Sequence, residues 1–552
     1  MKYRLFSLTA ATIVMTGLCF TGSAAGQNLD PKTLTLFHAP ADAWPTYNGD
    51  YSGRRFSAID QINQNNVSLL KIEWMYRIAG IGPQRGVGNP TIKSTPLMVN
   101  GILYFTIPDH VFAVNARTGE QLWQYDFEDK GGHLVGQRGV GMYGGWLYFM
   151  TPDGWFISLN AKDGKERWKK KVADEKLQYF TTMAPMIVKN HVLVGVGGDA
   201  MDVRGYLESR DPETGDVQWR WWSEPQKPGD PGADTWPNKA AMDHGGGMTW
   251  LPGTYDPELN LLYWGTGNAN PVFAGQSRKG ANLWTASLVA LNPDTGKLVW
   301  WFQASPHDTH DWDNVETPVL FDATIDGKPR KLLAQGARCG WFFVLDRTNG
   351  KNLVSKPFSG TGNWAKGVDA KGQPIPDPAK EPKVDGSMID MPSMGATNWP
   401  PPSYDPQTEL FYLNGTEAYG IAYLYDTSDE PEGYGGGGGG NFDGRSVLLA
   451  MDVKTGAVRW KHEHTSSGFG GGGMSGGILT TAGHLLFTGD SGNLEAFDPA
   501  AGKPLWHQKL ISPVSNGPET WELDGKQYII AGAGDTLYAF TLAGSGSDTQ
   551  RK

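Results

Sequence analysis

Short apolar segments separated by tight glycine turns recur along the whole chain. One phrase returns seven times, and each copy joins a strand of alternating character to a second strand through an Asn/Asp-x-x-x-Gly turn. The copies are VFAVNARTGEQLW, FISLNAKDGKERW, LESRDPETGDVQW, LVALNPDTGKLVW, FFVLDRTNGKNLV, LLAMDVKTGAVRW and LEAFDPAAGKPLW. Because glycine adopts positive φ without strain, each copy predicts a β-hairpin whose second strand ends in an aromatic residue.

Further strand-like runs lie between the copies, so that each unit supplies about four strands. These runs include GWLYFMT, HVLVGVG, LLYWGTG and HLLFTGD. Successive turn glycines such as Gly119 and Gly164 are separated by about the 40–50 residues of a propeller blade. Seven phrases, plus one unmatched strand pattern at each end (LLKIEWMYRI and DTLYAFTLAG), predict an all-β, eight-bladed β-propeller whose last blade both termini close. A seven-bladed ring is the alternative.

Most of the 22 tryptophans have a structural explanation within this repeat. We expect each repeat-terminal Trp to dock flat between neighbouring blades. There it buries a large apolar area while its indole N–H finds a backbone acceptor. A tryptophan outside the repeat phrase is therefore a better candidate for a functional role.

Charge and the N-terminal pattern narrow the class of protein. The net charge of −10 and the even scatter of Lys and Arg argue against a nucleic-acid partner, which needs a basic patch. Residues 1–26 combine Lys2 and Arg4, an apolar run and small residues, which predicts a cleavable secretory signal peptide and a periplasmic mature propeller from 27 to 552. A membrane anchor is the alternative, but the apolar run is shorter than the roughly 20 residues of a span, so we expect none.

The two cysteines exclude two further features. Cys19 lies inside the predicted signal peptide, which leaves Cys339 alone in the mature chain and so predicts no disulfide. No C-x-x-C-H motif occurs, so no covalently attached c-type haem is expected.

One loop concentrates groups that can bind metals or move protons: PHDTHDWDN, residues 306–314. Together with other segments, in order and in register with the repeats, it resembles the pyrroloquinoline-quinone (PQQ) dehydrogenases, the family of methanol, ethanol and membrane glucose dehydrogenases. The segments are WPTYNGDYSGRRFS, APMIVKNHVLVGVGGDAMDVRGYL, YWGTGN, PHDTHDWD and ARCGWFFVLDR. The resemblance covers essentially the whole mature chain.

The resemblance implies two catalytic residues. Asp311 matches the base that accepts the alcohol proton as hydride leaves for the quinone. Arg338 matches the cation that hydrogen-bonds the quinone oxygens and stabilises the reduced ring.

The implied metal ligands are oxygen donors: Asp311, the amide of Asn268, and Asp313. Asp313 resembles the extra aspartate of members that use a lanthanide, so the resemblance implies either Ca²⁺ or a lanthanide ion. Where many relatives place a metal-ligating glutamate this chain has Ala200. The neighbouring Asp199 and Asp202 could each supply the carboxylate instead, and we expect Asp199 to do so. Zinc, which prefers nitrogen or sulfur, suits this set poorly, and we expect the loop's histidines to shape the loop.

Several residues are implied to contact PQQ. Trp250, which lies outside the repeat phrase after three glycines, matches the indole stacked under the ring. Thr182 matches a hydroxyl near the PQQ carboxylates, and Asn398 with Trp399 matches a pair at the ring's rim. Where alcohol dehydrogenases carry an adjacent cysteine pair, this chain has Arg138 and Gly139, and Arg138 could pair with a PQQ carboxylate. Lys93, at a family glutamate position, could help to hold the anionic cofactor.

Two glycine tracts, 433–444 and 468–477, are expected to be loops that pass close to the cofactor or gate the channel. The sequence as a whole predicts a PQQ- and metal-dependent dehydrogenase that oxidises an alcohol or polyol hydroxyl to a carbonyl. Its electrons would leave to a separate periplasmic cytochrome or similar acceptor. The alternatives are an aldose or hydroxylated-heterocycle dehydrogenase, which the missing cysteine pair favours over a simple-alcohol enzyme, and a PQQ-repeat scaffold without a cofactor.

Overall fold

Strands are the main regular element of the structure, a computed structural model that describes residues 28–84, 88–128, 131, 136–198, 202–431, 436–467 and 476–544. Within these ranges the one α-helix is α1 (Lys239–Asp243). Short 3₁₀ turns cover Pro31–Thr33, Val67–Leu69, Glu175–Leu177, Ala233–Thr235 and Gly275–Arg278. No helix in the described part of the chain is long and apolar enough to cross a membrane.

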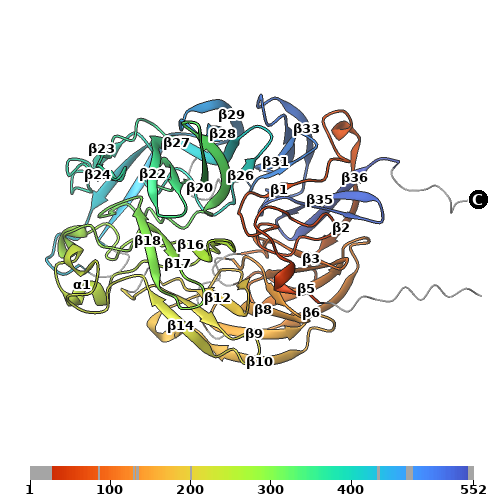
Figure 1. The fold of residues 1–552 in the computed structure, drawn as a ribbon, viewed down its shortest axis with the longest axis horizontal. Helices are drawn as coiled ribbons and strands as arrows, with labels where there is room; N and C mark the ends of the chain where they lie inside the picture. The colour runs from red at the N-terminus through yellow and green to blue at the C-terminus, as the bar shows by residue number, and fades with distance from the viewer. Residues whose placement is uncertain are drawn as a thin grey trace, which may run out of the picture.

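The described strands form eight sheets of four or five strands, which follow one another around a common centre, and a ninth of two strands (Figure 1). The first four sheets contain β3 (Leu97–Val99), β4 (Ile102–Ile107), β5 (His110–Asn115) and β6 (Gln121–Asp126); β7 (Gly141–Tyr143), β8 (Trp146–Met150), β9 (Trp155–Asn160) and β10 (Glu166–Lys171); β11 (Met186–Val188), β12 (His191–Gly195), β13 (Tyr206–Arg210) and β14 (Val217–Trp222); and β15 (Thr254–Asp256), β16 (Leu261–Gly265), β17 (Ser287–Leu291) and β18 (Leu298–Gln303).

The next four sheets complete the circuit. They contain β19 (Val319–Ile325), β20 (Lys328–Gly336), β21 (Trp341–Asp346) and β22 (Lys351–Pro357); β25 (Ser387–Ile389), β26 (Ser403–Asp405), β27 (Leu410–Leu424), β28 (Gly437–Asp452) and β29 (Val458–Ser467); β1 (Phe56–Ser57), β30 (Leu479–Thr481), β31 (Leu485–Asp490), β32 (Asn493–Phe497) and β33 (Pro504–Lys509); and β34 (Glu519–Leu523), β35 (Lys526–Ala533), β36 (Thr536–Leu542) and β2 (Leu70–Arg77). The two-stranded sheet is β23 (Ala365–Val368) with β24 (Pro374–Pro376).

The two ends of the chain meet in one sheet. β2 pairs antiparallel with β36, from Leu70 opposite Leu542 to Arg77 opposite Thr536. The prediction that both terminal strand patterns share a sheet is confirmed. β1 adds a second link, because it pairs parallel with β30 more than 400 residues later.

The repeated phrase forms the predicted hairpins. In the first copy the Asn115 side chain accepts a 2.9 Å hydrogen bond from the Arg117 N–H, and Gly119 has φ +73°. An Asn or Asp at this position can cap the turn in the same way, which accounts for the recurrence of these residues. The second strand does not end at its aromatic residue as predicted: β6 continues past Trp123 to Asp126, because its pairing with β5 extends to His110.

The repeat tryptophans link each sheet to the next. Trp123 donates from its indole N–H to the Ala161 carbonyl at 3.2 Å, and a Cβ on Gly164 would lie 2.7 Å from its ring, so the indole lies flat against the next turn. The same indole-on-glycine contact occurs in the pairs Trp74–Gly119, Trp168–Gly215, Trp219–Gly296, Trp300–Gly350 and Trp460–Gly502. The copy FFVLDRTNGKNLV has Val354 where the others have Trp, and Gly456, the turn glycine of the next copy, lies against Val354 and Lys356.

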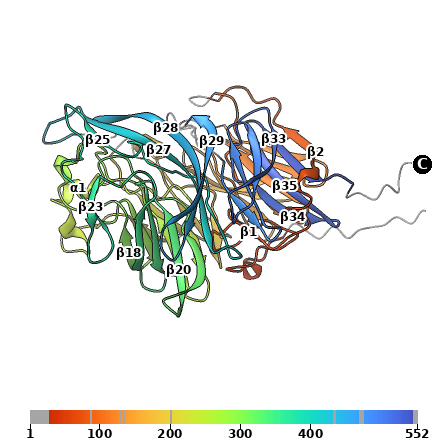
Figure 2. The same cartoon turned by 90° about the horizontal axis from the view of Figure 1, so that it is seen from above.

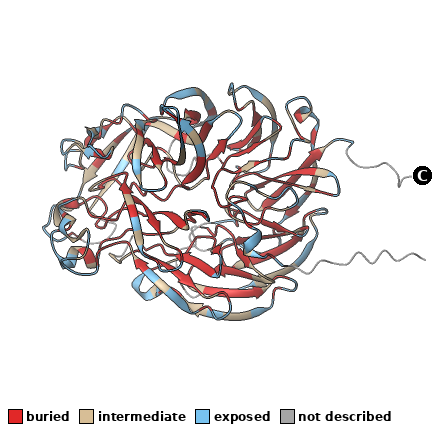
Figure 3. Ribbon diagram, viewed as in Figure 1, coloured by how far each residue is buried: buried red, intermediate tan, exposed pale blue. Residues whose placement is uncertain are grey.

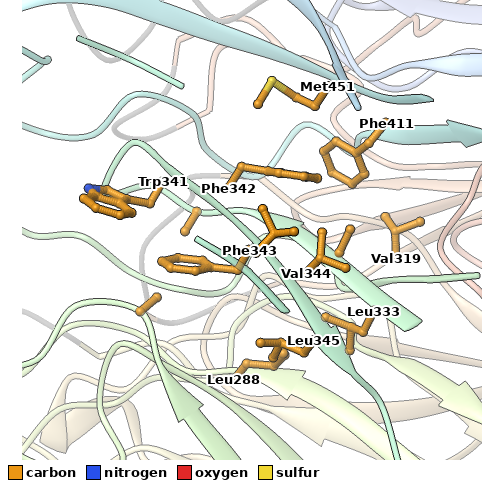
Figure 4. Packing of buried hydrophobic residues seen from close by; sticks show 14 of the residues in the cluster. Leu288, Val319, Leu333, Trp341, Phe342, Phe343, Val344, Leu345, Phe411 and Met451 are labelled. Atoms are coloured by element: carbon orange, nitrogen blue, oxygen red, sulfur yellow. The ribbon is translucent and has the colours of Figure 1, made fainter. Parts of the chain in front are cut away.

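The apolar core lies between neighbouring sheets. On β21, Phe342 packs on Phe411 of the following sheet, with ring centroids 5.1 Å apart (Figure 4). Phe343 packs on Phe302 of the preceding sheet, with ring centroids 5.0 Å apart. Alternate side chains of a strand therefore bury themselves against different neighbours. The edge strands at the rim are more exposed than the middle strands, as the contrast between β10 and β9 shows (Figure 3).

The first glycine tract corrects a prediction. Its described part belongs to β28, which pairs with β27 in a long hairpin (Figure 2), rather than to a loop. A Cβ on Gly437 would lie 2.4 Å from the Phe273 Cβ, and one on Gly439 would lie 2.6 Å from Ser393 Oγ. Glycine is thus required in this strand because neighbouring segments approach its backbone closely. Residues 432–435 and 468–475, which include most of the second tract, lie outside the described residues.

Candidate active site

The residues predicted for the site occupy equivalent places in the fold. Most lie in segments that lead into the first strand of successive sheets: Lys93 before β3, Arg138 before β7, Thr182 before β11, Trp250 before β15, and Asp311 and Asp313 before β19. Asn398 and Trp399 lie between β25 and β26 of the following sheet. Asn268 follows β16, and Arg338 lies in the turn between β20 and β21. Because the sheets are arranged around one centre, residues at the same end of each sheet converge (Figure 1).

Hydrogen bonds join several of these segments side by side. The Thr95 N–H donates to the Arg138 carbonyl, and the Arg138 N–H donates to the Thr182 carbonyl, both at 3.0 Å. Thr182 Oγ1 in turn donates to the Trp250 carbonyl at 3.3 Å. Four predicted segments therefore form a continuous row.

Arg338 connects the two key aspartates. Its Nη2 donates to Asp311 Oδ2 at 2.8 Å, its Nη1 donates to Asp313 Oδ2 at 2.9 Å, and its Nε donates to the Met394 carbonyl at 2.9 Å. All three charged side chains are buried. A Cβ on Gly395 would lie only 2.2 Å from Arg338 Cγ, so a glycine is needed for the arginine to pass.

Asp313 also orders the residues predicted to face PQQ and the metal. Its Oδ2 accepts a 3.1 Å hydrogen bond from the Trp250 indole N–H, and its Oδ1 accepts one of 2.7 Å from the Asn268 backbone N–H. A Cβ on Gly267 would lie 2.6 Å from Asp313 Oδ1. The glycine of the G-T-G-N segment therefore makes room for the carboxylate.

An oxygen at this centre lacks a partner. Asn268 Nδ2 donates to the Ala269 carbonyl at 3.1 Å, but the buried Oδ1 accepts no hydrogen bond. An unpaired buried acceptor beside two carboxylates is costly unless a cation binds it. Hard cations such as Ca²⁺ and the lanthanides take carboxylate and amide oxygens, so this donor set fits the implied metal. Asp199 and Ala200 lie outside the described residues.

The loop of residues 304–318 is held by its own polar groups. Asp308 accepts hydrogen bonds from the Trp312 N–H at 3.0 Å and the His310 N–H at 3.3 Å, and burial raises its pKa to about 6. His310 stacks on Trp312 with ring centroids 4.2 Å apart, and burial lowers its pKa to about 4. Asp311 itself has φ +66°, a left-handed conformation that this bracing maintains. His310 thus packs within the loop, and its backbone N–H helps to hold the Asp308 carboxylate.

A cationic cluster lies on the other side of Trp250. The Arg138 guanidinium lies 4.7 Å from the centre of the Trp250 ring and 5.1 Å from that of Trp399. Burial lowers the pKa of Arg138 to about 10, and burial together with the charge of Arg138 lowers the pKa of Lys93. Arg138 Nε is buried without a hydrogen-bond acceptor. A buried arginine and a half-buried lysine that repel each other fit a polycarboxylate such as PQQ.

Asn398 lies beside a small cavity. Its Oδ1 accepts from the Trp399 N–H at 2.8 Å, and it lines this cavity with Asn414 and Thr416. A backbone bond from Ala396 to the Arg338 carbonyl, 2.8 Å, ties this segment to the centre.

Two buried acids near the centre were not predicted. Burial raises the pKa of Glu316 to about 8, and the charges of Arg338 and Asp313 act on it. Burial also raises the pKa of Glu224 well above its usual value, and a Cβ on Gly247 would lie 2.8 Å from Glu224 Oε1. The three glycines before Trp250 therefore allow a close approach, here to Glu224. The available signal was an acidic residue between two apolar or small ones, which is too common to single these residues out.

Comparisons with known proteins agree with this geometry. The family described as "Glucose/ethanol/alcohol dehydrogenase, beta-propeller domain" matches residues 44–391, and the model "Outer membrane protein assembly factor BamB" matches residues 444–547. The quinoprotein alcohol dehydrogenase PedH of Pseudomonas putida is 37% identical, over 95% of this chain and 91% of that protein.

Two solved structures extend the similarity. The quinohemoprotein alcohol dehydrogenase of Comamonas testosteroni has a TM-score of 0.84 and 32% identity, over 96% of this chain and 84% of that one. A europium-containing methanol dehydrogenase has a TM-score of 0.78 and 29% identity, over 91% of this chain and 98% of that one. The chain therefore belongs to the quinoprotein alcohol dehydrogenase family and is a PQQ-dependent oxidoreductase.

Proposed function

We propose that this protein is a periplasmic dehydrogenase that oxidises an alcohol or polyol hydroxyl to a carbonyl, with PQQ and either Ca²⁺ or a lanthanide ion bound at the Arg338 centre. The observation that carries the proposal is the buried contact of Arg338 with Asp311 and Asp313, next to the unpartnered Asn268 Oδ1. Two carboxylates and one guanidinium leave an excess negative charge, which a cation would neutralise.

Each residue has a defined task in this proposal. When bound, PQQ supplies the acceptor for the hydride that leaves the alcohol carbon. Asp311 accepts the hydroxyl proton, and Arg338 orients that carboxylate through the hydrogen bond from its Nη2. Asp313 fixes the indole of Trp250 through its Nε1–H. Asn268, Asp311, Asp313 and Asp199 would hold the metal.

The cationic cluster would bind the acidic edge of the cofactor. Arg138 and Lys93 carry the charge for this contact, with Thr182 beside Arg138 and with Asn398 and Trp399 at the rim. Because Arg138 lies over the Trp250 ring, its guanidinium must move aside when a planar ring stacks on the indole. Arg138 would then cover the ring face that the cysteine pair covers in other family members.

We further propose an eight-bladed ring. Each repeat tryptophan before the last, or its Val354 equivalent, contacts a turn glycine of the next sheet. The last repeat tryptophan, Trp506, meets Phe540 in the sheet that also contains β2, with ring centroids 5.7 Å apart. This series of contacts returns to its starting sheet after eight steps. We also propose that residues 1–26 act as a signal peptide and that residues 27–552 form the propeller.

The electron acceptor is proposed to be a separate cytochrome c or a similar periplasmic protein. The Comamonas relative is a quinohemoprotein by name, whereas this sequence contains no C-x-x-C-H motif. Electrons collected at the quinone would then have to leave to another molecule.

The decisive test is reconstitution of the purified protein with PQQ and Ca²⁺ or La³⁺, followed by dye reduction on alcohols, polyols and aldoses. Activity on alcohols or polyols supports the proposal, activity restricted to aldoses would replace its substrate class, and failure to bind PQQ under either ion would overturn it. Asp313→Ala should reduce La³⁺-supported activity at least ten-fold more than Ca²⁺-supported activity. An unchanged ratio would remove Asp313 from the metal site.

A further inference from the structure

A second group of metal-capable side chains lies between two neighbouring sheets, away from the Arg338 centre. His462 and His464 are two residues apart on β29, so both point to the same face of that strand. Glu495 lies on β32 of the next sheet. One potential ligand atom from each of the three residues lies within 4.8 Å of the others.

His464 is held in the tautomer that a metal requires. Its Nε2 lies 3.0 Å from Asn414 Oδ1, and the Asn414 amide is fixed because its Nδ2 donates to the Gly476 carbonyl at 2.6 Å and to Thr488 Oγ1 at 2.8 Å. The amide oxygen can only accept, so Nε2 of His464 carries the proton. Nδ1 then presents a lone pair.

That lone pair has no hydrogen-bond partner, although the His464 side chain has 0% relative exposure. Its nearest charged neighbour is Asp490, whose Oδ2 lies 4.0 Å away and also accepts from the Thr465 N–H and hydroxyl. A buried, neutral imidazole whose oriented lone pair has no hydrogen-bond partner is suited to bind a metal ion.

Glu495 contributes a second unused atom. Its Oε2 is buried without a partner, and burial followed by the charge of Asp490 raises its pKa to about 7. A carboxylate in such a position gains from a nearby cation. The His462 ring packs edge-on against Phe497 at 4.8 Å between centroids, which limits its rotation and keeps it beside His464.

We propose that His462, His464 and Glu495 form a binding site for a divalent transition metal of the zinc type, which clips β29 to β32. Two imidazoles and one carboxylate suit Zn²⁺, with water in the fourth position, and suit Ca²⁺ or a lanthanide poorly. Modest side-chain rotations would bring the three ligand atoms to about 2.0–2.2 Å from one ion. Asn414 would act as the outer partner that orients His464.

The test uses the full chain, carrying PQQ and the metal of the Arg338 centre, after weak chelation removes loosely bound ions. Zn²⁺ is titrated by calorimetry at pH 7.5, and Co²⁺ is titrated as a spectroscopic probe of coordination geometry. We expect one zinc equivalent per chain, visible d–d bands with Co²⁺, and a zinc-dependent rise in the thermal midpoint. His464→Gln and the isosteric Glu495→Gln should each weaken zinc binding at least ten-fold.

His110→Gln provides a matched control, because His110 forms an exposed pair with Asp126, at 2.7 Å, that lies outside the cluster. It should leave the zinc equivalent and the midpoint shift unchanged. Zinc binding that is absent from the wild type, or that survives unchanged in both cluster variants, would overturn the site. Circular dichroism without zinc shows whether each variant is folded. If His464→Gln does not fold, Glu495→Gln still tests the site, because it replaces only one oxygen of the carboxylate with an amide nitrogen.

Discussion

At Arg338, one guanidinium binds two carboxylates through different nitrogens, and both carboxylates are buried. Burying such charges is costly unless each is paired, so this arrangement persists only where the surroundings compensate it. On the other side of Trp250, Arg138 and Lys93 form a positive group. The site is therefore divided into a negative part suited to a cation and a positive part suited to the carboxylates of a cofactor.

Replacing Asp311 with Asn should separate catalysis from binding. The amide keeps the size of the side chain but cannot accept the hydroxyl proton, so we expect kcat to fall about 10²–10⁴-fold. PQQ binding, followed by absorbance, should stay within a few-fold of the wild type. Asp326→Asn, in the β19–β20 turn, is the control and should leave kcat unchanged. Retained turnover in Asp311→Asn would show that another group takes the proton.

Glu224 should make stability depend on pH. Burial raises its pKa in the folded protein, so above about pH 4.5 the unfolded chain loses this proton while the folded protein keeps it. Stability therefore falls as pH rises, by up to about 1.4 kcal/mol per pH unit, until the raised pKa is passed. We expect Glu224→Gln to gain stability relative to the wild type between pH 5 and pH 7 in urea unfolding. The same difference in the free energy of unfolding between the variant and the wild type at pH 5 and at pH 7 would contradict this expectation.

At the scale of elements, the ring is assembled by contacts between the tryptophan of one hairpin and the turn glycine of the next. Gly164 needs its glycine for two reasons: it has φ +70°, and a Cβ would lie 2.7 Å from Trp123. Gly327 has φ +72° in the β19–β20 turn but has nothing within 4 Å of a Cβ. Comparing substitutions at these two glycines therefore separates the cost of left-handed backbone strain from the cost of displacing the tryptophan ring.

Gly164→Ala should cost about 2–4 kcal/mol in the free energy of unfolding, because about 1–2 kcal/mol of left-handed strain adds to the overpacking of the indole. Gly327→Ala should cost only the left-handed backbone strain, about 1–2 kcal/mol. Urea denaturation followed by tryptophan fluorescence measures both. Equal losses of stability in the two variants would mean that the Trp123 indole moves aside without cost and that its contact with Gly164 does not define the spacing of the sheets.

Elements whose cause lies within a few residues could be predicted, and elements whose cause lies far away in the sequence could not. The hairpins follow from residues within one phrase, such as the Asn115 cap and the positive φ of Gly119. The strand at Gly437 was predicted as a loop because its cause is distant: Phe273 approaches the glycine backbone from another segment. Glycine propensity alone indicates flexibility, whereas here it permits close packing.

The same distinction holds for the site and the whole molecule. The resemblance pointed to the residues, but not to the fact that Asp313 contacts Arg338, Trp250 and Asn268 together. These contacts join segments of two neighbouring sheets, β15–β18 and β19–β22, whose relative positions follow from the ring. For the same reason, Glu316 and Glu224 could not be recognised, because only their burial distinguishes them from surface acids.

The whole molecule is held together by segments far apart in the sequence, and Arg55 is the clearest of them. Its buried guanidinium donates to the carbonyls of Tyr47 at 2.9 Å, Ile478 at 3.0 Å and Pro518 at 2.6 Å. Its charge also opposes the large rise that burial causes in the pKa of Glu519. One side chain thus joins the N-terminal segment to the two sheets that complete the circuit.

Arg55→Met should therefore weaken the entire fold rather than one end of it. Three carbonyls lose their donor and Glu519 loses its counter-charge, so we expect a loss of about 3–5 kcal/mol with a single unfolding transition at a lower midpoint. Arg54→Met is the control, because the Arg54 side chain makes its hydrogen bonds and ion pair, among the described residues, with Ser52, the Phe37 carbonyl and Asp50 of the same segment. Hydrogen exchange in residues 479–542 should accelerate in Arg55→Met alone. If only residues 28–60 lost protection, the N-terminal segment would be an attachment to a ring that closes without it.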